Sequence, residues 1–243
     1  MNQNVSVVIF FKNIASEVLD STIREVLTAV DNVDVQAEII IINDGTLNFN
    51  FNHAILFERD FKFVNLPKSI GISGAIFKGA ELAKYKKVLP IPGHDMYSHT
   101  AVSNVLNLTD KGRLILGCRS NLAKERPIMK KFASRILRDL YRHIAFYYIG
   151  DIHGLIMYEK QDLLNYLNQK GGHTNAIRVV TNVLVSGGLL VQTIAPIKEG
   201  HRKERNANFL NRIVKPANVI QVIFELLKIR KLVKNSQQGD LYI

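Results

Sequence analysis

Three short apolar runs, each followed by a polar turn, constrain the fold of this chain more than any other feature. Residues 5–11, 38–42 and 87–91 are rich in Val, Ile and Leu and lack the alternation of a half-exposed strand. Between them lie stretches of helical periodicity such as 16–30, where apolar residues recur every three to four positions. Apolar strands alternating with helices are typical of an α/β fold, in which helices cover both faces of a mostly parallel central sheet.

The chain of 243 residues is expected to form one α/β domain with a C-terminal extension. No internal repeat or low-complexity linker divides it, so we assign residues 1–212 to the main domain. Residues 213–243 are expected to form a basic amphipathic helix with a polar tail. Such a helix could lie on an anionic membrane, pack on the domain or form a homodimer contact, and the sequence leaves these alternatives open.

The net positive charge of the chain indicates which classes of partner it could bind. The formal net charge is +11, and the excess of Lys and Arg is concentrated in residues 119–142 and 198–234. A positive field attracts nucleic acid, anionic lipid or phosphorylated small molecules, although basic residues can also form an ordinary solvated face.

The expected setting is the cytoplasm. Cys118 is the single cysteine, so no intrachain disulfide can form. We find neither a signal peptide nor an apolar run fit to span a bilayer. If the C-terminal helix binds lipid, the chain would lie at the inner face of the plasma membrane.

Polar residues follow two of the apolar runs, at the edge where parallel sheets bind ligands. Ligands of such sheets lie outside the carboxyl ends of the strands. Residues 43–46 read Asn-Asp-Gly-Thr, and residues 92–95 read Pro-Gly-His-Asp. Either segment alone is also ordinary turn chemistry. Two such segments at strand ends of one sheet favour a ligand site.

The blocks of this sequence resemble, in order, those of the inverting family 2 glycosyltransferases with a GT-A fold. The resemblance is greatest to the branch that contains the polyprenyl-phosphate (dolichol-phosphate) sugar transferases. It covers roughly residues 4–205. The matching blocks are residues 5–13, 38–46, 65–79, 87–97, 117–119, 151–154 and 188–202.

This resemblance implies a hexosyltransferase of polysaccharide biosynthesis. The enzyme would move a sugar from a nucleotide-sugar donor to a lipid-phosphate or surface-polysaccharide acceptor, with inversion at the anomeric carbon. The alternative is a degenerate, non-catalytic scaffold that binds a polyanion such as nucleic acid or an anionic membrane. Nucleic acid is the less expected partner, because Trp is absent and most aromatic residues lie in apolar runs.

The resemblance also assigns residues to the donor site. It places Asp44 on the base or ribose, where a carboxylate accepts hydrogen bonds from an imide or hydroxyl. The other donor candidates are Phe10, Asn13, Lys68 and Gly71. Guanidinium groups hold phosphates through paired hydrogen bonds. The candidates for contacts with the diphosphate or the acceptor are therefore Arg119, Arg202 and Arg205.

One departure from the family pattern concerns the cation. The Asp-X-Asp element, which binds a divalent cation in the family, reads Pro92-Gly-His94 here and is followed by Asp95. Asp95 could act alone on Mg²⁺, His94 could join it on Mn²⁺, or basic residues could neutralise the diphosphate without a metal. The expectation is Mn²⁺ or Mg²⁺, with Asp95 and His94 as its candidate ligands.

A second departure concerns the catalytic base. Residues 179–183 contain no carboxylate, although the family often carries its base there. A sugar hydroxyl must lose a proton when it attacks, whereas a phosphate acceptor is already ionised. The change therefore favours a lipid-phosphate acceptor, or it makes Asp151 or His153 the catalytic base. It also fits an inactive relative.

Overall fold

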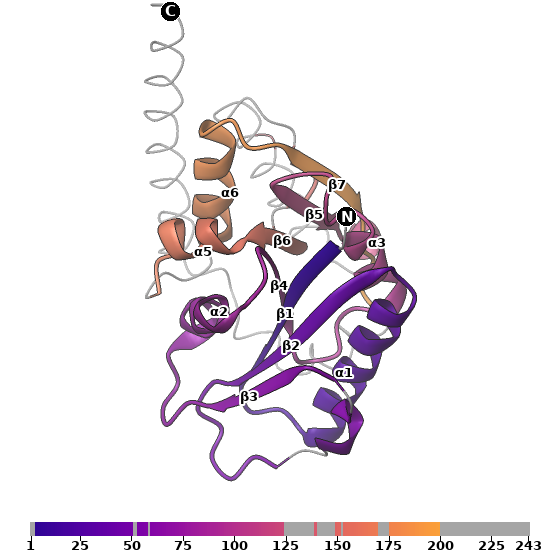
Figure 1. Cartoon of the computed structure of the whole chain (residues 1–243), viewed down its shortest axis with the longest axis vertical. Coiled ribbons are helices and arrows are strands. Elements are labelled where there is room, and N and C mark those ends of the chain that lie inside the picture. The colour runs from indigo at the N-terminus through magenta and orange to yellow at the C-terminus, as the bar shows by residue number, and fades with distance from the viewer. Residues whose placement is uncertain are drawn as a thin grey trace, which may run out of the picture.

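The computed structural model describes residues 3–50, 53–57, 59–123, 139, 149–151, 153–169 and 175–199 (Figure 1). These residues form a seven-stranded sheet in the order β3-β2-β1-β4-β6-β5-β7. The strands are β1 (Gln3–Phe11), β2 (Val35–Asn43), β3 (Phe61–Asn65), β4 (Lys87–Pro92), β5 (Leu114–Cys118), β6 (Leu155–Glu159) and β7 (Leu190–Ile194).

The direction of the strands confirms a mostly parallel sheet. β1 pairs in parallel with β2 and β4, and β2 pairs in parallel with β3. β6 is antiparallel to both β4 and β5, while β5 and β7 are parallel. Among the described strands, β6 alone therefore runs against the others.

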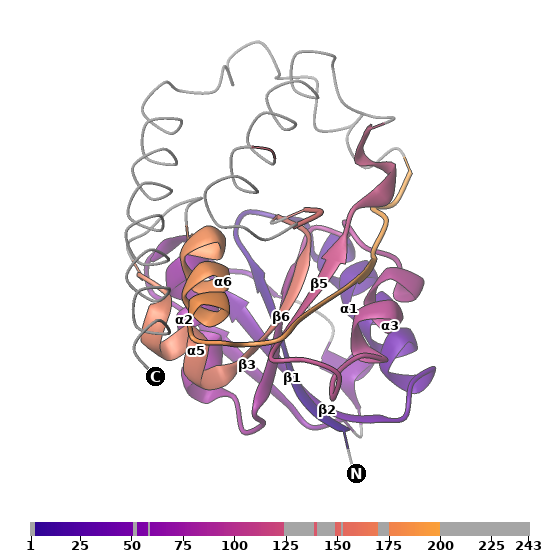
Figure 2. The same cartoon turned by 90° about the horizontal axis from the view of Figure 1, so that it is seen from above.

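Helices cover both faces of this sheet, as the apolar runs predict (Figures 1 and 2). The side chains of Val5, Val7 and Ile9 lie in one buried cluster with residues of α1 and α3. Val8 and Ile40 point to the other face and pack with residues of α2, α5 and α6. The helices are α1 (Ser16–Asp31), α2 (Gly71–Leu82), α3 (His99–Leu106), α5 (Lys160–Tyr166) and α6 (Asn175–Val185), with 3-10 turns η1 (His53–Leu56) and η2 (Ser120–Ala123).

One glycine sets how closely α2 approaches the sheet. A Cβ atom at Gly79 would lie 2.2 Å from Cγ1 of Val8, which is fully buried in β1. Any larger side chain at this position would push the helix away from the strand.

The predicted C-terminal helix and the boundary between residues 212 and 213 lie outside the described residues. Within the part of the chain that the structure describes, no helix is long and apolar enough to cross a membrane. α6 has no counterpart among the helices expected from the sequence.

Candidate functional site at the carboxyl edge of the sheet

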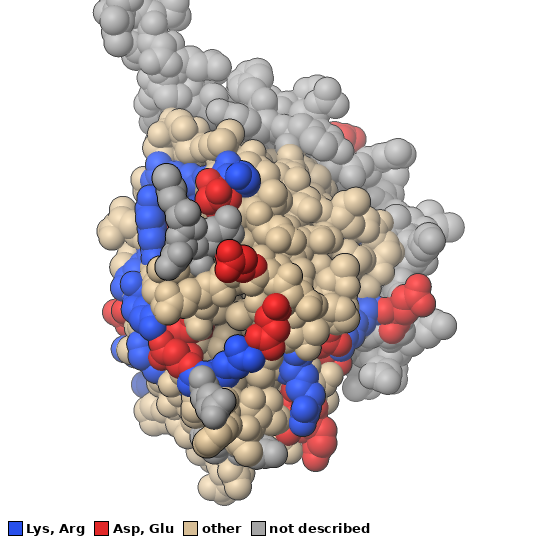
Figure 3. Space-filling view, turned by 45° about the vertical axis from the view of Figure 1, so that its right-hand side comes forward, with Lys and Arg blue, Asp and Glu red and all other residues tan. Residues whose placement is uncertain are grey.

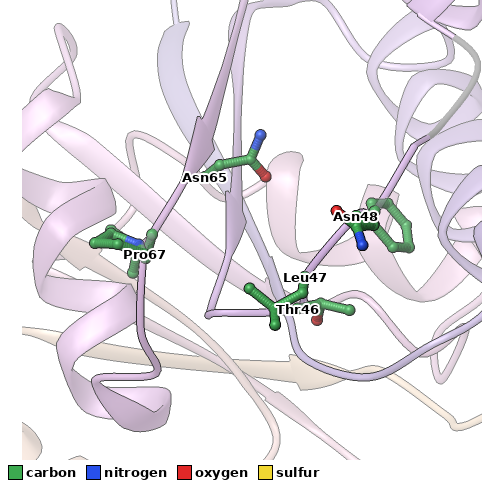
Figure 4. Close-up of a pocket in the computed structure, with 7 residues that line it drawn as sticks. Thr46, Leu47, Asn48, Asn65 and Pro67 are labelled. Carbon is green, nitrogen blue, oxygen red and sulfur yellow. The ribbon is translucent and has the colours of Figure 1, made fainter.

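The carboxyl ends of β1, β2, β3 and β4 meet at one edge of the sheet, because these strands are parallel neighbours. A pocket of about 320 Å³ opens there between the segments that follow β2 and β3 (Figure 4). It is lined by Thr46, Leu47, Asn48, Phe49, Asn65, Leu66 and Pro67. The lining contains amides, a hydroxyl and apolar groups but no charged side chain.

Asn43 stabilises a turn at residues 43–46, at the end of β2. The Oδ1 atom of Asn43 accepts a hydrogen bond from the backbone N–H of Thr46 at 2.9 Å, and its Nδ2 donates to the Thr46 carbonyl at 2.8 Å. The same Nδ2 donates to Oδ1 of Asn65 at 2.8 Å, which joins the ends of β2 and β3. The backbone N–H of Asn13 donates to the Thr46 hydroxyl at 2.8 Å and brings the end of β1 to the same turn.

Asp44 anchors α2. Its carboxylate accepts hydrogen bonds from the Ser69 hydroxyl at 2.7 Å, from the Ile70 N–H at 2.7 Å and from the Gly71 N–H at 3.1 Å. A negative charge is favourable at a helix N-terminus, where backbone N–H groups lack helical partners. Asp44 is 5% exposed and does not line the pocket. The base or ribose contact expected of Asp44 therefore stays a prediction, beside an anchoring role that its contacts establish.

The other donor candidates separate into two groups. Asn13, which contacts Thr46, and Lys68, which follows Pro67, are exposed beside residues that line the pocket, whereas Gly71 is exposed and donates its N–H to Asp44. Phe10 instead packs against the apolar cluster under α2. The aromatic ring at the pocket belongs to Phe49, whose centroid lies 4.5 Å from that of Phe11. Sequence reasoning missed Phe49 and the pocket-lining role of Asn65.

Arg119 and Asp151 form a buried ion pair that joins the end of β5 to the segment before β6. Nε of Arg119 lies 2.5 Å from Oδ2 of Asp151, and Nη2 lies 2.8 Å from Oδ1. The two side chains are 7% and 16% exposed. Burial raises the pKa of the Asp151 carboxyl, but the hydrogen bonds and charge of Arg119 outweigh burial, so the pKa is lowered overall.

This ion pair bears on two predicted roles. A carboxylate with a lowered pKa is a weak base, so the contacts of Asp151 do not favour the general-base role that the sequence analysis gave it. The Nε and Nη2 groups of Arg119 donate to the Asp151 carboxylate, so this pair of donors is not available to a phosphate. His153 is exposed, and its backbone N–H donates to Oδ1 of Asp151 at 3.3 Å. Arg202 and Arg205 lie outside the described residues.

Asp95 lies in a cluster with α1 and the segment after β7. Its φ is +52°, and its backbone N–H donates to the Thr22 hydroxyl at 2.9 Å. The Lys198 ammonium lies 2.6 Å from Oδ1 of Asp95 and 2.7 Å from Oε1 of Glu25. His99 adds its backbone N–H to Glu25 at 2.5 Å. Burial alone would lower the pKa of Lys198, but the two carboxylates raise it.

These residues do not fit a divalent cation. Pro92 has no donor atom in its side chain, and the carboxylate of Asp95 is already paired with Lys198. His94 offers an imidazole, which suits Mn²⁺ better than Mg²⁺, but the Asp95 carboxylate that would complete an Mn²⁺ site is the one paired with Lys198. The described residues contain no group of three His, Cys, Asp or Glu side chains that could hold a metal ion.

On the face seen in Figure 3, basic and acidic side chains lie next to one another. Arg59 pairs with Asp31 at 2.8 Å, and Lys86 pairs with Glu159 at 3.0 Å. The described residues contain nearly equal numbers of basic and acidic side chains, so the net positive charge of the chain comes from residues outside them.

Solved structures with this architecture decide the fold. The chain is similar to glucosyl-3-phosphoglycerate synthase from Mycobacterium tuberculosis in complex with UDP, with a TM-score of 0.64 and 15% identity over 94% of this chain and 80% of that one. The chain has a GT-A glycosyltransferase fold. No family model and no curated protein matches the sequence.

The chain is also similar to GT-A structures that were solved with nucleotide sugars and Mn²⁺. The same mycobacterial synthase in complex with Mn²⁺, UDP-glucose and phosphoglyceric acid has a TM-score of 0.59 at 13% identity, over 93% of this chain and 80% of that one. The mannosyltransferase PcManGT from Pyrobaculum calidifontis, in complex with GDP-mannose and Mn²⁺, has a TM-score of 0.58 at 11% identity, over 98% and 74%. These neighbours are glycosyltransferases, and the structures named were solved with nucleotides or nucleotide sugars.

Proposed function

We propose that this chain is a glycosyltransferase that takes a sugar from a nucleotide-sugar donor bound at the carboxyl edge of its sheet. The observation that carries the proposal is the pocket between the segments after β2 and β3, in a fold whose solved neighbours bind UDP, UDP-glucose or GDP-mannose. In an open sheet, this edge is where ligands bind.

The lining of the pocket suits a nucleobase. The amides of Asn48 and Asn65 can donate to and accept from the polar edge of a base, while Phe49 and Leu47 offer apolar contact to its faces. The lining carries no charge, so the pocket suits the neutral base better than the phosphates. The phosphates and the sugar would extend from it along the edge of the sheet.

The transfer would be a single displacement with inversion. An oxygen of the acceptor would attack the anomeric carbon as the bond from that carbon to the donor diphosphate breaks, and the nucleoside diphosphate would leave with the bonding electrons. An acceptor that attacks through a phosphate oxygen needs no base to remove a proton. The weak basicity of the paired Asp151 and the lack of a carboxylate in residues 179–183 support such an acceptor.

We favour a lipid phosphate as the acceptor, as in the polyprenyl-phosphate branch, over a growing surface polysaccharide, whose hydroxyl would need a base. The cytoplasmic setting, the contact with the inner face of the plasma membrane and the homodimer belong to the same proposal. They depend on residues 213–243, which lie outside the described residues.

A non-catalytic scaffold for polyanions is not favoured. The solved neighbours of this fold are glycosyltransferases, and their structures hold nucleotides or nucleotide sugars. The donor pocket has no role in that alternative.

Calorimetry of the full chain with UDP, GDP, CDP, ADP and their sugars tests the proposal. We expect one nucleoside diphosphate to bind, and its sugar to be hydrolysed or transferred slowly when a polyprenyl phosphate is added. A folded chain that binds none of these nucleotides, with or without Mn²⁺ and Mg²⁺, would rule the proposal out.

A further inference from the structure

The segment after β4, where the family resemblance places a cation, has lost its ligands in two independent ways. Pro92 replaces the first carboxylate of the Asp-X-Asp element, and His94 replaces the second. The next carboxylate is that of Asp95, which has a φ of +52° and whose backbone N–H donates to the hydroxyl of Thr22 in α1. The residue types of this segment therefore differ from those of a cation site, and its last residue is bonded to α1.

The carboxylate of Asp95 is also neutralised by the chain itself. Lys198 lies 103 positions along the chain, and its ammonium contacts Asp95 at 2.6 Å and Glu25 at 2.7 Å. The Lys198 side chain is 25% exposed, so water screens these contacts only partly. A divalent cation at Asp95 would have to displace an ammonium that two carboxylates hold, or bind within a few ångströms of it and be repelled.

Two lysines are next in the sequence to residues that contact or line the pocket. Lys12 follows β1 directly, and its neighbour Asn13 donates its N–H to the hydroxyl of Thr46, which lines the pocket. Lys68 follows Pro67, which also lines the pocket. Gly45 lets the Lys68 segment approach the end of β2 closely, because a Cβ atom there would lie 2.8 Å from the Lys68 carbonyl carbon. Both lysines are exposed.

We propose that this chain binds its nucleotide donor without a divalent cation and that Lys12 and Lys68 supply the positive charge for the diphosphate. The inference rests on the proposed function. An ammonium group binds phosphate as a compact point charge and needs no fixed geometry, so exposed lysines on two loops suit this role. When the donor breaks down, the same two charges would stabilise the leaving diphosphate.

The test is calorimetric binding of UDP, GDP, CDP and ADP to the full chain, in EDTA and again with Mn²⁺ or Mg²⁺. We expect the Kd of the preferred nucleotide to change less than about threefold between these conditions. Lys12→Gln and Lys68→Gln should each weaken its binding about tenfold, since each removes a charge-assisted contact. Neither substitution should change the weaker binding of the corresponding nucleoside, which carries no phosphate.

Lys78→Gln is the matched control. Lys78 is an exposed lysine on α2 that pairs with Glu81 at 3.2 Å and does not line the pocket. Its removal lowers the net charge equally and should leave the Kd unchanged. Binding that appears only with a metal would overturn the inference and leave the proposed function standing. Full affinity of both the Lys12 and the Lys68 variant would likewise overturn it. Failure of every nucleotide to bind in either condition would instead refute the proposed function.

Discussion

Asp44 illustrates how one side chain can hold an element in place beside a ligand pocket. It is buried, and all the hydrogen bonds described for its side chain come from Ser69, Ile70 and Gly71 at the start of α2. The carboxylate of Asp44 therefore ties the end of β2 to the start of α2. A change at Asp44 should act first on the stability of α2 and only through it on ligand binding.

Replacing Asp44 with Ala should lower the free energy of unfolding by about 1–2 kcal/mol, because the N–H groups that begin α2 lose their acceptor. Urea unfolding measures this loss. Ser98→Ala removes the cap of α3, where the Ser98 hydroxyl accepts from the Ala101 N–H, and is a control remote from the pocket. If the two variants lose similar stability but Asp44→Ala alone loses nucleotide affinity, the loss of binding comes from Asp44 and the start of α2 and not from lower stability in general. Unchanged stability of Asp44→Ala would contradict its anchoring role.

The ion pair of Arg119 and Asp151 predicts a second effect at this scale. Arg119→Leu should cost about 3–5 kcal/mol of stability, because it leaves the Asp151 carboxylate buried without its counter-charge. The double variant Arg119→Leu with Asp151→Leu should recover most of the loss. Unfolding of the two variants and the parent at pH 7 checks this. Equal loss in the single and double variants would show that the charge is not the cause.

The same ion pair gives the parent protein a pH dependence. Asp151 has a lowered pKa in the folded state, so its contribution is complete above the ordinary aspartate pKa of about 3.9 and is lost as the pH falls through the lower folded value. We expect the stability difference between the parent and the double variant to be constant from pH 7 to pH 5 and to shift against the parent below about pH 4. A parallel acid dependence of the two proteins would contradict this assignment.

At the scale of elements, the packing of α2 on β1 depends on Gly79. Gly79→Ala should destabilise the fold by about 1–3 kcal/mol, because the added methyl meets Val8, which is buried in the sheet and cannot move aside. Thermal unfolding provides the measurement. Gly74→Ala in the same helix is the control, since its methyl would meet only the side chain of Ile70, which is 41% exposed. Equal stability of the two variants would show that the helix shifts freely.

Elements also differ in how well the sequence predicts them. The runs at 5–11, 38–42 and 87–91 predict β1, β2 and β4, because strands buried on both faces need continuous apolar residues. α6 was not among the elements expected from the sequence, although its buried residues Ile177, Val180 and Leu184 recur at helical spacing. Its β-branched residues lower the local preference for a helix, and packing against the sheet face compensates for this. The reversed direction of β6 likewise depends on contacts with β4 and β5, far along the chain.

The candidate site was predictable only in part, because some of its contacts join residues that are far apart in the sequence. Residues next to strand ends, such as Asn13 and Lys68, could be placed at the carboxyl edge from the strand pattern alone. The partners of Asp95 and Asp151 could not, because Lys198 and Arg119 are 103 and 32 positions away and no local pattern joins them. Whether a carboxylate is free or paired is a property of the folded chain.

At the scale of the whole molecule, donor binding should stabilise the fold as a unit. A ligand that binds only the folded state at a hundred times its Kd adds about 2.7 kcal/mol to the free energy of unfolding. We expect the preferred nucleoside diphosphate to raise the Tm by several degrees in EDTA, and Phe49→Ala to reduce this shift because the pocket loses an apolar wall. An unchanged shift in Phe49→Ala would place the nucleotide elsewhere.

The ion pair between the end of β5 and the segment before β6 also bears on how much the stretch between Arg119 and Asp151 can vary in length and sequence. The backbone N–H of Arg119 lies 3.3 Å from the carboxylate of Asp151, so the intervening stretch leaves the sheet and returns to it at nearly the same point. A stretch whose two ends are fixed side by side can be lengthened, shortened or exchanged without moving the strands that flank it. The chain could therefore carry segments of different length and sequence between residues 119 and 151 while the strands of its sheet stay in place.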